Sequence, residues 1–257
     1  MNRTTAPCAL LLLCTGAFAV DPPAVVTQSL PGRPGMVVGV ARLQDAVSWT
    51  GARDLAEACG GELFIPVESD DLHAVAGLTG KLGPWECTGP WLGGQRVPAS
   101  TPLDSGWVDV SGVGLQMVHW SPGQPAGSPS LHWKAAIDGR DSELDTWVNV
   151  LPDPDAGPAV HGYVFTVEAT APDCDHNGIS DAIEIIILGA VDLNEDGIPD
   201  RCATDLDGDG LVGGSDLAVL LGQWGTCSDR DSCTADFNDD GIVDGYDLSV
   251  LLSNWGI

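Results

Sequence analysis

The sequence predicts an α+β protein built in two parts, and three observations support this fold class. In the first part, two segments with helical spacing precede a series of short apolar runs separated by Gly, Pro and Asp. This is the pattern of two helices and a sheet of short strands. In the second part, an acidic motif occurs twice, at 205–225 and 236–256, and each copy runs into an apolar helical segment. The composition also changes between the parts, because residues 171–257 hold 19 acidic and only 2 basic residues.

The first 19 residues have the form of a secretory signal. Arg3 gives the positive start, Ala9 to Phe18 the apolar stretch, and Ala17 to Ala19 an A-x-A cleavage site before Val20. The apolar stretch is too short to span a bilayer. We therefore expect a signal peptide over 1–19 and a secreted, extracellular or cell-surface protein without a membrane span. Residues 20–35 are rich in proline and are expected to form a linker.

The charge balance restricts the class of partner. The chain carries 37 acidic and 10 basic residues, a net charge of −27. Such a chain repels nucleic acid and anionic membranes and attracts divalent cations. We expect no nucleic-acid partner.

Cysteine usage fits an oxidising compartment. Outside the signal the chain has an even number of cysteines, which favours disulfides in a secreted protein. The absence of a C-x-x-C pair argues against a zinc ribbon or a thioredoxin-like site. The six residues are Cys59, Cys87, Cys174, Cys202, Cys227 and Cys233.

Residues 36–169 are expected to begin with helices and continue with strands. Apolar residues recur at helical spacing from Trp49 to Cys59, and Gly60 ends that pattern. A second helix is expected from Ser69 to Leu78. The candidate strands are Trp91–Gly93, Met117–Trp120, Trp133–Ile137, Trp147–Leu151 and Gly162–Val167.

A set of landmarks in this segment occurs in a characteristic order. It runs W-x-x-A on the first helix, C-G-G-E-L-F-I, W-L-G-G, W-x-P-G-Q-P, W-V-N and G-Y-V-F. This order resembles the C-type lectin-like domain over 36–169. The resemblance implies two helices flanking a twisted antiparallel sheet, with a long loop that carries the ligand site. Trp91, Trp120 and Trp147 are expected in the core rather than exposed as sugar-stacking platforms.

The resemblance also identifies a candidate ligand loop. Sugar-binding members chelate calcium through Gln-Pro-Asp or Glu-Pro-Asn and a later Asn-Asp. Here the motifs read Gln124-Pro125-Ala126 and Asn149-Val150, so two side-chain oxygens are missing, although Asp138, Asp141, Glu143 and Asp145 could substitute. Calcium needs six to eight oxygens, so we doubt calcium-dependent sugar binding and leave open a glycan or protein ligand bound without metal. Phe165 stands where the family's last cysteine would fall, which leaves Cys59 to pair with Cys87.

The segment 170–203 contains two calcium-type loops. Each has side-chain oxygens at loop positions 1, 3 and 5 and a glycine at position 6, as calcium loops require. The candidate ligands are Asp173, Asp175, Asn177, Asp181 and Glu184 in the first loop, and Asp192, Asn194, Asp196 and Asp200 in the second. The pattern is similar to thrombospondin type-3 calcium repeats, which implies a calcium-stiffened spacer rather than a sensor. Cys174 and Cys202 bracket the loops and are expected to bridge.

The duplicated segment 204–257 repeats the same oxygen pattern, with an aspartate at position 12 of each copy. The candidate ligands are Asp205, Asp207, Asp209, the Leu211 carbonyl and Asp216 in one copy, and Asp236, Asn238, Asp240, the Ile242 carbonyl, Asp244 and Asp247 in the other. A single helix follows each loop, at Asp216–Trp224 and Asp247–Trp255. The unit resembles a type I dockerin, a small all-α calcium-loop domain. The resemblance implies two antiparallel helices packed through repeated Leu, Val and Trp, and a cohesin-like partner contacted at Ser215 and Tyr246. Cys227 and Cys233 are expected to form a local bridge.

These features favour a secreted calcium-binding adaptor. Its lectin-like part would bind a glycan or protein ligand, and its tail would dock to a cohesin-like scaffold or surface protein. No nucleophile elbow, H-E-x-x-H, P-loop or paired-Glu arrangement appears in the sequence, which argues against an enzyme. Two alternatives stay open: a dockerin-tethered component of extracellular polysaccharide degradation, and a purely structural envelope protein.

Overall fold

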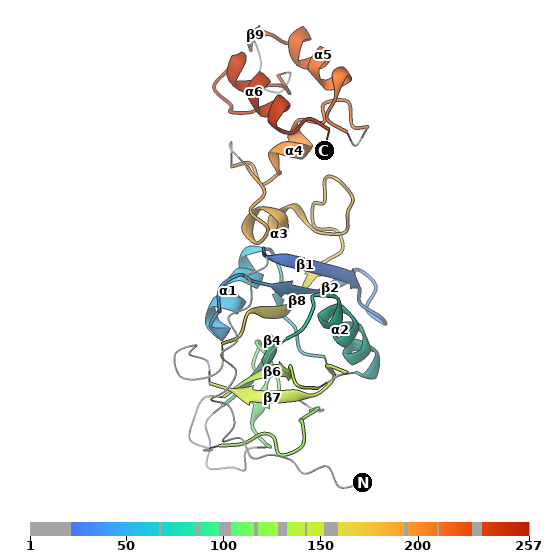
Figure 1. Cartoon of the computed structure of the whole chain (residues 1–257), viewed down its shortest axis with the longest axis vertical. Coiled ribbons are helices and arrows are strands. Elements are labelled where there is room, and N and C mark those ends of the chain that lie inside the picture. The colour runs from blue at the N-terminus through green and yellow to red at the C-terminus, as the bar shows by residue number, and fades with distance from the viewer. Residues whose placement is uncertain are drawn as a thin grey trace. The chain divides into compact units, whose positions relative to one another are not determined.

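The structure is a computed structural model. It describes residues 22–66, 68–85, 88–97, 104–115, 118–127, 133–141, 143–151, 159–192, 195–209, 211–227 and 233–256. The chain divides into two compact units, Met1–Ala171 and Pro172–Ile257, which we call the N-terminal unit and the C-terminal unit (Figure 1).

The first helix of the N-terminal unit, α1 (Trp49–Ala58), begins where the sequence predicts. The Ser48 side chain caps it by accepting a hydrogen bond from the Gly51 amide at 3.0 Å. Trp49, Ala52 and Ala56 lie on one face and are buried. The helix ends before Gly60, which adopts a left-handed conformation at φ +76°.

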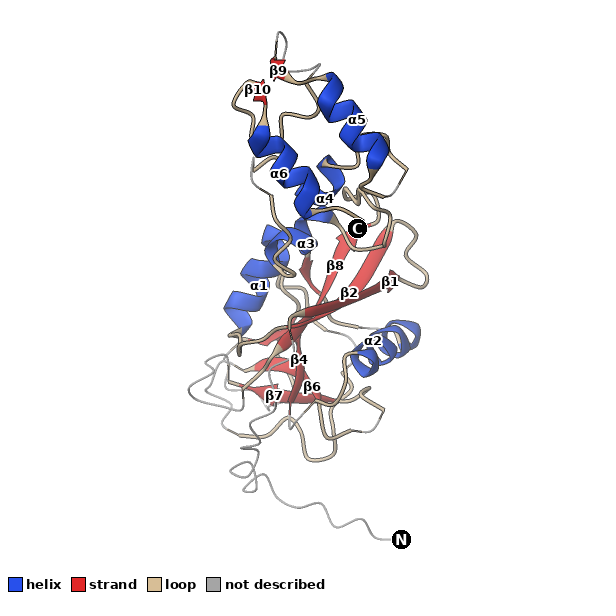
Figure 2. Ribbon diagram, turned by 45° about the horizontal axis from the view of Figure 1, so that its top comes forward, coloured by secondary structure: helices blue, strands red, loops and turns tan. Residues whose placement is uncertain are grey.

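The second helix, α2 (Ser69–Lys81), extends three residues beyond the predicted end. Leu72, Val75 and Leu78 recur at helical spacing and are buried. Asp71 in its first turn is also buried and accepts a hydrogen bond from Arg33 Nη2 at 3.1 Å. Figure 2 shows α1 and α2 on opposite sides of the long strands of the sheet.

The strands form one mixed sheet in the order β1-β2-β8-β4-β6-β7, with β3 added on β8 and β5 on β4. The neighbours are antiparallel except β4 and β8, which are parallel where Trp91 lies opposite Tyr163. This confirms the predicted α+β class of two helices and a sheet, with one parallel pair in place of a wholly antiparallel arrangement. The bounds are β1 Ala24–Ser29, β2 Met36–Arg42, β3 Glu62–Leu63, β4 Thr88–Arg96, β5 Trp107–Val108, β6 Lys134–Asp138, β7 Trp147–Val150 and β8 Gly162–Glu168.

The segment 20–35, expected to be a linker, contains a strand of the sheet. Residues 24–29 form β1, which pairs along its whole length with β2 in an antiparallel hairpin. The prolines suggested a linker, but they flank a run of residues with high strand propensity, and Val25 is buried. Pairing with β1 also satisfies the amides of β2 that would otherwise form a sheet edge.

The strand predicted over Met117–Trp120 is not present in its described part. His119 and Trp120 lie outside the strands, and Trp120 makes only an isolated bridge with Trp147. Met117 lies outside the described residues. The apolar character that suggested a strand here serves packing instead, because Trp120 contacts the main core and the rings of Trp107 and Trp147.

Tryptophans account for much of the core, as expected. Trp91 and Trp147 are fully buried and Trp120 is partly buried. The indole nitrogen of Trp91 donates to the Val47 carbonyl, and that of Trp49 donates to the Leu92 carbonyl, both at 2.8 Å. These bonds satisfy the polar end of each ring and connect α1 and the segment before it to β4.

Phe165 stands at the position where the resemblance would place a cysteine. It is buried on β8, and its ring packs directly over Gly39 of β2, so a methyl group at residue 39 would collide with the ring. The central strands are therefore held together here by aromatic packing. Cys59 is buried, but its expected partner Cys87 lies outside the described residues, so this pairing stays a prediction.

The C-terminal unit is built from short helices and loops. Its elements are α3 Asp181–Ile186, α4 Asp200–Ala203, α5 Gly214–Gly222, β9 Gly225–Thr226, β10 Ile242–Val243 and α6 Gly245–Ser253. The helices α5 and α6 begin two residues before the predicted starts, because the loop residues just ahead of each aspartate already have helical geometry. The Cys174–Cys202 and Cys227–Cys233 disulfides are both present.

The packing of this unit differs from the expectation in one respect. Leucine and valine side chains of both copies form a small core with Phe237 and Ala235, as the resemblance implied. The repeated tryptophans do not join it, because Trp224 and Trp255 are 48% and 46% exposed. Each follows the last turn of its helix, where the chain has already left the shared core. Among the described residues, no helix combines the length and the apolar composition needed to cross a bilayer.

Candidate calcium-binding loops

The four predicted loops have the same left-handed turn residues at the positions that the structure describes. We call them loop 1 (173–184), loop 2 (192–203), loop 3 (205–216) and loop 4 (236–247). Position 4 of every loop is left-handed, with φ of 57°, 58°, 73° and 55° at His176, Glu195, Gly208 and Asp239. Position 6 is left-handed wherever the structure describes it, at Gly178, Gly197 and Gly241. Sequence reasoning found the glycine at position 6 but missed position 4, where only Gly208 gives a signal.

The first aspartate of each loop is fixed by backbone amides. It accepts a hydrogen bond from the position-6 amide in loops 1, 2 and 4, at 2.9, 3.0 and 2.8 Å, and from the position-4 amide in loop 3, at 2.9 Å. The loop therefore closes on its own first side chain. This contact orients the carboxylate toward the interior of the loop before any ligand is present.

The side chain at position 5 is fixed in the same way. Its oxygen accepts a hydrogen bond from the position-7 amide in all four loops, over 2.7–2.9 Å. Because one oxygen is held by the backbone, the side chain has a defined direction and little rotational freedom left to lose on binding. The residues are Asn177, Asp196, Asp209 and Asp240.

Loops 3 and 4 are closed from the other end by a buried aspartate. Asp216 and Asp247 have no exposed surface. The two oxygens of Asp216 accept from the amides of Asp207 at 3.1 Å and Gly213 at 2.6 Å. Burial would raise the pKa of Asp216, but these amide hydrogen bonds outweigh it and lower the pKa. Asp247 accepts in the same manner from Phe237 and Asp244, at 2.9 and 2.8 Å.

The donor set of loop 3 fits a hard divalent cation. Carboxylate oxygens of Asp205, Asp207 and Asp209 lie within 4.8 Å of one another. Carboxylate oxygens and backbone carbonyls are the ligands that calcium prefers. Asp216 is linked to this group through the Asp207 amide, and with the Leu211 carbonyl it would complete the set named from the sequence.

In loop 4, Asp244 was predicted as a calcium ligand, but its side chain has a second role. The Asp244 side chain accepts from the Tyr246 amide at 2.7 Å and so caps α6. Asp236, Asn238 and Asp240 are joined by hydrogen bonds within the loop. Ile242 lies in β10, opposite Thr226 of β9.

Loop 1 contains a cation of the chain itself. Arg201 Nη2 donates to Asp175 Oδ2 at 2.7 Å and to Glu184 Oε1. Burial would raise the pKa of Asp175, but hydrogen bonds from the Asn177 amide and Arg201 lower it. In loop 2, Asp200 is buried, Asp192 and Asp196 are in place, and Asn194 lies outside the described residues.

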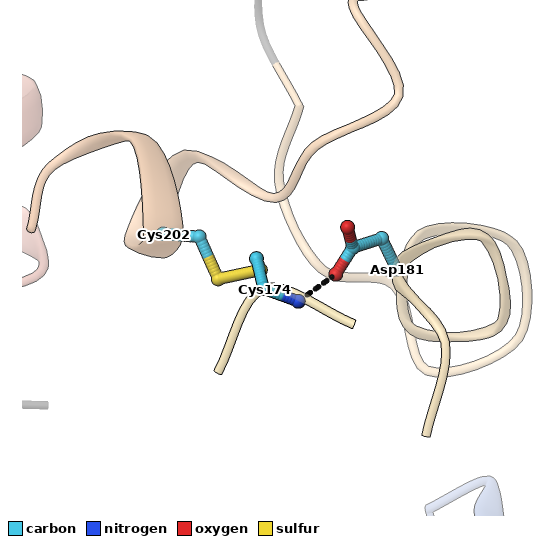
Figure 3. A group of neighbouring side chains, drawn as sticks. All are labelled: Cys174, Asp181 and Cys202. Carbon is cyan, nitrogen blue, oxygen red and sulfur yellow. Dashed lines mark hydrogen bonds between the residues drawn. A yellow bond between two sulfur atoms is a disulfide. The ribbon is translucent and has the colours of Figure 1, made fainter. Parts of the chain in front are cut away.

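A second group of potential ligands does not form a metal site. Cys174, Asp181 and Cys202 lie together in Figure 3, but the two sulfurs are joined in a disulfide and offer no thiolate. Asp181 Oδ1 accepts from the Cys174 amide at 2.9 Å. Asp181 thus anchors the start of loop 1, as Asp216 and Asp247 anchor loops 3 and 4.

The candidate ligand loop of the N-terminal unit is closed on itself. The Asn149 side chain accepts from the Ala126 amide at 2.8 Å and donates to the Ala126 carbonyl at 2.7 Å. The motifs around Gln124-Pro125 and Asn149 are therefore brought together, as the resemblance implied. Gln124 Oε1 is buried and has no hydrogen-bond partner among the described residues.

The acids near this loop are held by neighbouring side chains. Asp138 accepts a hydrogen bond from the Ser121 hydroxyl at 2.7 Å. It also accepts two from Arg140, from Nε to Oδ1 at 2.8 Å and from Nη2 to Oδ2 at 2.9 Å. Asp141 accepts from Thr146 at 2.6 Å. These contacts leave Asp138 paired with a guanidinium, which makes it a poor substitute for a calcium ligand.

The candidate partner-contact residues lie on the surface. Ser215 and Tyr246 are the second residues of α5 and α6, and both side chains are exposed.

Comparison with known proteins gives only structural likenesses. No protein-family model and no curated protein matches this chain. Human lithostathine is 14% identical with a TM-score of 0.43, and the match covers 65% of this chain and 99% of that one. The carbohydrate-recognition domain of cow CD23 is 18% identical with a TM-score of 0.40, covering 54% and 92%. A calcium-independent type II antifreeze protein is 15% identical with a TM-score of 0.39, covering 56% and 96%. At these values the likenesses assign neither a ligand nor an activity to this chain.

Proposed function

We propose that this chain is a secreted, non-enzymatic adaptor whose C-terminal unit folds around calcium and docks to a partner protein. Its N-terminal unit binds a glycan or protein ligand without a metal. The observation that carries the proposal is a contact common to loops 1 to 4, in which the position-7 amide holds the side-chain oxygen at position 5.

Calcium would supply charge neutralisation to loops 3 and 4. Asp205, Asp207, Asp209 and Asp216 would hold it in loop 3, and Asp236, Asn238, Asp240 and Asp247 in loop 4. Without a cation, converging carboxylates repel one another, so binding energy becomes folding energy for the unit. This arrangement is consistent with the dockerin-like reading of 204–257.

Loops 1 and 2 support a spacer role for 170–203. Each loop is short, closed by its own hydrogen bonds, and tied to the other by the Cys174–Cys202 disulfide. A segment constrained in this way loses little further entropy when calcium binds, which suits a stiff connector. This supports the thrombospondin type-3-like reading.

Docking to a cohesin-like protein is supported by a matched surface. Apolar residues at equivalent places of the two copies are exposed, namely Leu221 with Leu252 and Trp224 with Trp255. Ser215 and Tyr246 lie at the starts of the same helices. Exposed aromatic and aliphatic residues of this kind are typical of protein interfaces.

A ligand bound without metal is supported by the contacts of Asn149. Its side-chain oxygen is already used by the Ala126 amide, and Ala126 has no side-chain oxygen of its own. A calcium ion at this place would lose two of the oxygens it needs. We expect any glycan binding by the N-terminal unit to persist in EDTA.

The proposal is tested with the mature secreted chain. Equilibrium dialysis at millimolar calcium should show stoichiometric uptake by several sites, and mass spectrometry should give an N-terminus at Val20. A glycan array run in parallel with calcium and with EDTA should give the same pattern. No uptake of calcium would overturn the calcium-dependent module, and a pattern that disappears in EDTA would overturn metal-free binding.

Docking is tested with purified cohesin domains on a biosensor surface. Binding should require calcium and should fall about tenfold or more for Tyr246→Ala, as for an interface anchor. Ser249→Ala, an exposed change on the same helix, is the control. Calcium-loaded protein that binds none of the cohesins would contradict the docking proposal and leave calcium binding intact.

A further inference from the structure

We propose that Arg201 is a tethered cation that occupies loop 1 and competes with calcium for it. This inference rests on the proposed calcium binding and adds a regulation of one of its sites. Calcium would have to displace the guanidinium, so loop 1 binds calcium more weakly than its side chains alone would allow.

The contacts of Arg201 place its charge among the predicted ligands. Nη2 is bonded to Asp175 at position 3 and to Glu184 at position 12. The Asn177 side chain, at position 5, donates to the same two residues at 3.1 and 2.8 Å. Three of the five predicted ligands of loop 1 therefore converge where the guanidinium nitrogen lies.

The guanidinium of Arg201 leaves one carboxylate oxygen of Glu184 without a hydrogen bond among the described residues. Glu184 is 2% exposed, and its Oε2 is buried without a hydrogen-bond partner among the described residues. A buried carboxylate oxygen without a partner is destabilising. A calcium ion at this position takes both oxygens of a glutamate. The unsatisfied oxygen thus points to a second cation that binds better than Arg201 does.

Arg201 reaches loop 1 from the end of loop 2. It lies in α4, next to Cys202, which is bonded to Cys174 at position 2 of loop 1. The disulfide keeps the guanidinium close, so its effective concentration at loop 1 is high. The Arg201 side chain is 27% exposed, which gives it access to solvent when it is displaced.

The competition does not depend on pH in the physiological range, because a guanidinium stays protonated there. The hydrogen bond to Glu184 raises the pKa of Arg201 further, and burial lowers it by less. Loops 3 and 4 differ, since their position-12 aspartates accept backbone amides instead. The effect should therefore be confined to loop 1.

The experiment is a calcium titration of the full mature chain followed by hydrogen exchange and mass spectrometry. Peptides over 173–184 report loop 1, and peptides over 236–247 are the internal reference. For Arg201→Gln, the calcium concentration at half-maximal protection of loop 1 should fall about fivefold or more, the range of a typical coupling between sites. Loop 4 should not change.

Two further variants separate position from charge. Arg230→Gln removes the same charge from the other basic residue of 172–257 and should leave loop 1 at its wild-type midpoint. Arg201→Lys keeps a cation without the planar fork and should lie between wild type and Arg201→Gln. A chemical measurement needs no variant: calcium should increase the rate at which phenylglyoxal modifies Arg201, with Arg53 as the reference.

The outcomes distinguish the two proposals. An unchanged or higher midpoint for Arg201→Gln, with loop 1 still protected by calcium, overturns the competition and leaves calcium binding standing. Protection of loop 4 but not loop 1 in every variant overturns calcium binding at loop 1 and the competition with it. If Arg201→Gln does not fold, a phenylglyoxal rate that calcium leaves unchanged overturns the inference on the wild-type protein.

Discussion

At the scale of single residues, the buried carboxylates divide into two kinds. Among the described residues, Asp216 and Asp247 accept hydrogen bonds from backbone amides, so their position is set by the loop that they close. Asp138 and Glu184 instead meet guanidinium groups. The first kind is held by dipoles, whereas the second kind faces a cation of the chain itself.

Removing the charge of Asp247 should weaken loop 4 selectively. Asp247→Asn keeps the size of the side chain but loses a charged acceptor of two amides, so we expect a loss of about tenfold or more in calcium affinity at loop 4. Calorimetric titration of the mature chain, with hydrogen exchange over 236–247, measures it. Asp239→Asn at position 4 is the matched control, since asparagine tolerates the left-handed conformation found there. Equal losses in both variants would show that net charge, rather than the closing aspartate, sets the affinity.

Asp138 should make the N-terminal unit sensitive to acid. Burial would raise its pKa, but hydrogen bonds from Arg140 and Ser121 outweigh burial and lower it. Because the folded pKa lies below the unfolded value of about 3.9, the stabilisation is present above that value and is lost as pH falls through the folded pKa. Asp138→Asn should lower the free energy of unfolding by about 2 kcal/mol at pH 7.

Urea unfolding followed by tryptophan fluorescence from pH 7 to pH 2 tests this. The curves of wild type and Asp138→Asn should converge at the acid end. Asp54→Asn, at an exposed site on α1, should stay close to wild type throughout. A constant gap between wild type and Asp138→Asn at every pH would contradict the assignment of the effect to the ionised carboxylate.

At the scale of elements, close packing sets the position of the central strands. Gly39 on β2 faces the ring of Phe165 on β8, and the two residues are also partners in the strand register. The sequence analysis predicts a strand at β8 but none at β2, and it does not reveal that a glycine in β2 is matched to an aromatic ring in β8.

Two glycine-to-alanine variants should therefore change the stability of the N-terminal unit in opposite directions. Gly39→Ala places a methyl group into the Phe165 ring and should destabilise the N-terminal unit by about 1–3 kcal/mol. Gly77→Ala, in the interior of α2 with open space around it, should stabilise the unit by about 0.5–1 kcal/mol. Thermal unfolding of both variants measures the difference. A neutral Gly39→Ala would mean that the β2–β8 contact relaxes without loss.

At the scale of the whole molecule, the two compact units differ in what holds them together. The N-terminal unit has a large core of aliphatic and tryptophan side chains. The C-terminal unit has a small core, two disulfides and four acidic loops. A small unit with little apolar core depends on disulfides and metals for its stability.

Chelation should therefore unfold one unit and spare the other. In calcium, we expect a cooperative thermal transition for each unit. In EDTA, the transition of residues 172–256 should move to a much lower temperature, because calcium no longer stabilises the folded form, while the transition of the N-terminal unit stays in place. Calorimetry and far-ultraviolet circular dichroism follow both, and magnesium in place of calcium is the control. A circular dichroism spectrum that EDTA leaves unchanged would refute the metal dependence of the C-terminal unit.

Several features follow from the sequence by itself. Helical spacing locates α1, α2, α5 and α6 within a few residues, because each has its own apolar period and its own start signal. The acidic loops are also visible, because calcium-type ligands come from a short contiguous stretch with a fixed spacing.

Other features were decided by tertiary structure. The pairing of β1 with β2, the exposure of Trp224 and Trp255 and the closure of Asn149 on Ala126 all depend on what lies opposite in space. The same holds for Arg201, which belongs to loop 2 in the chain but binds two side chains of loop 1. Local spacing fixes which atoms a short segment can present, whereas contacts between distant segments arise only when the chain packs, so no local pattern contains them.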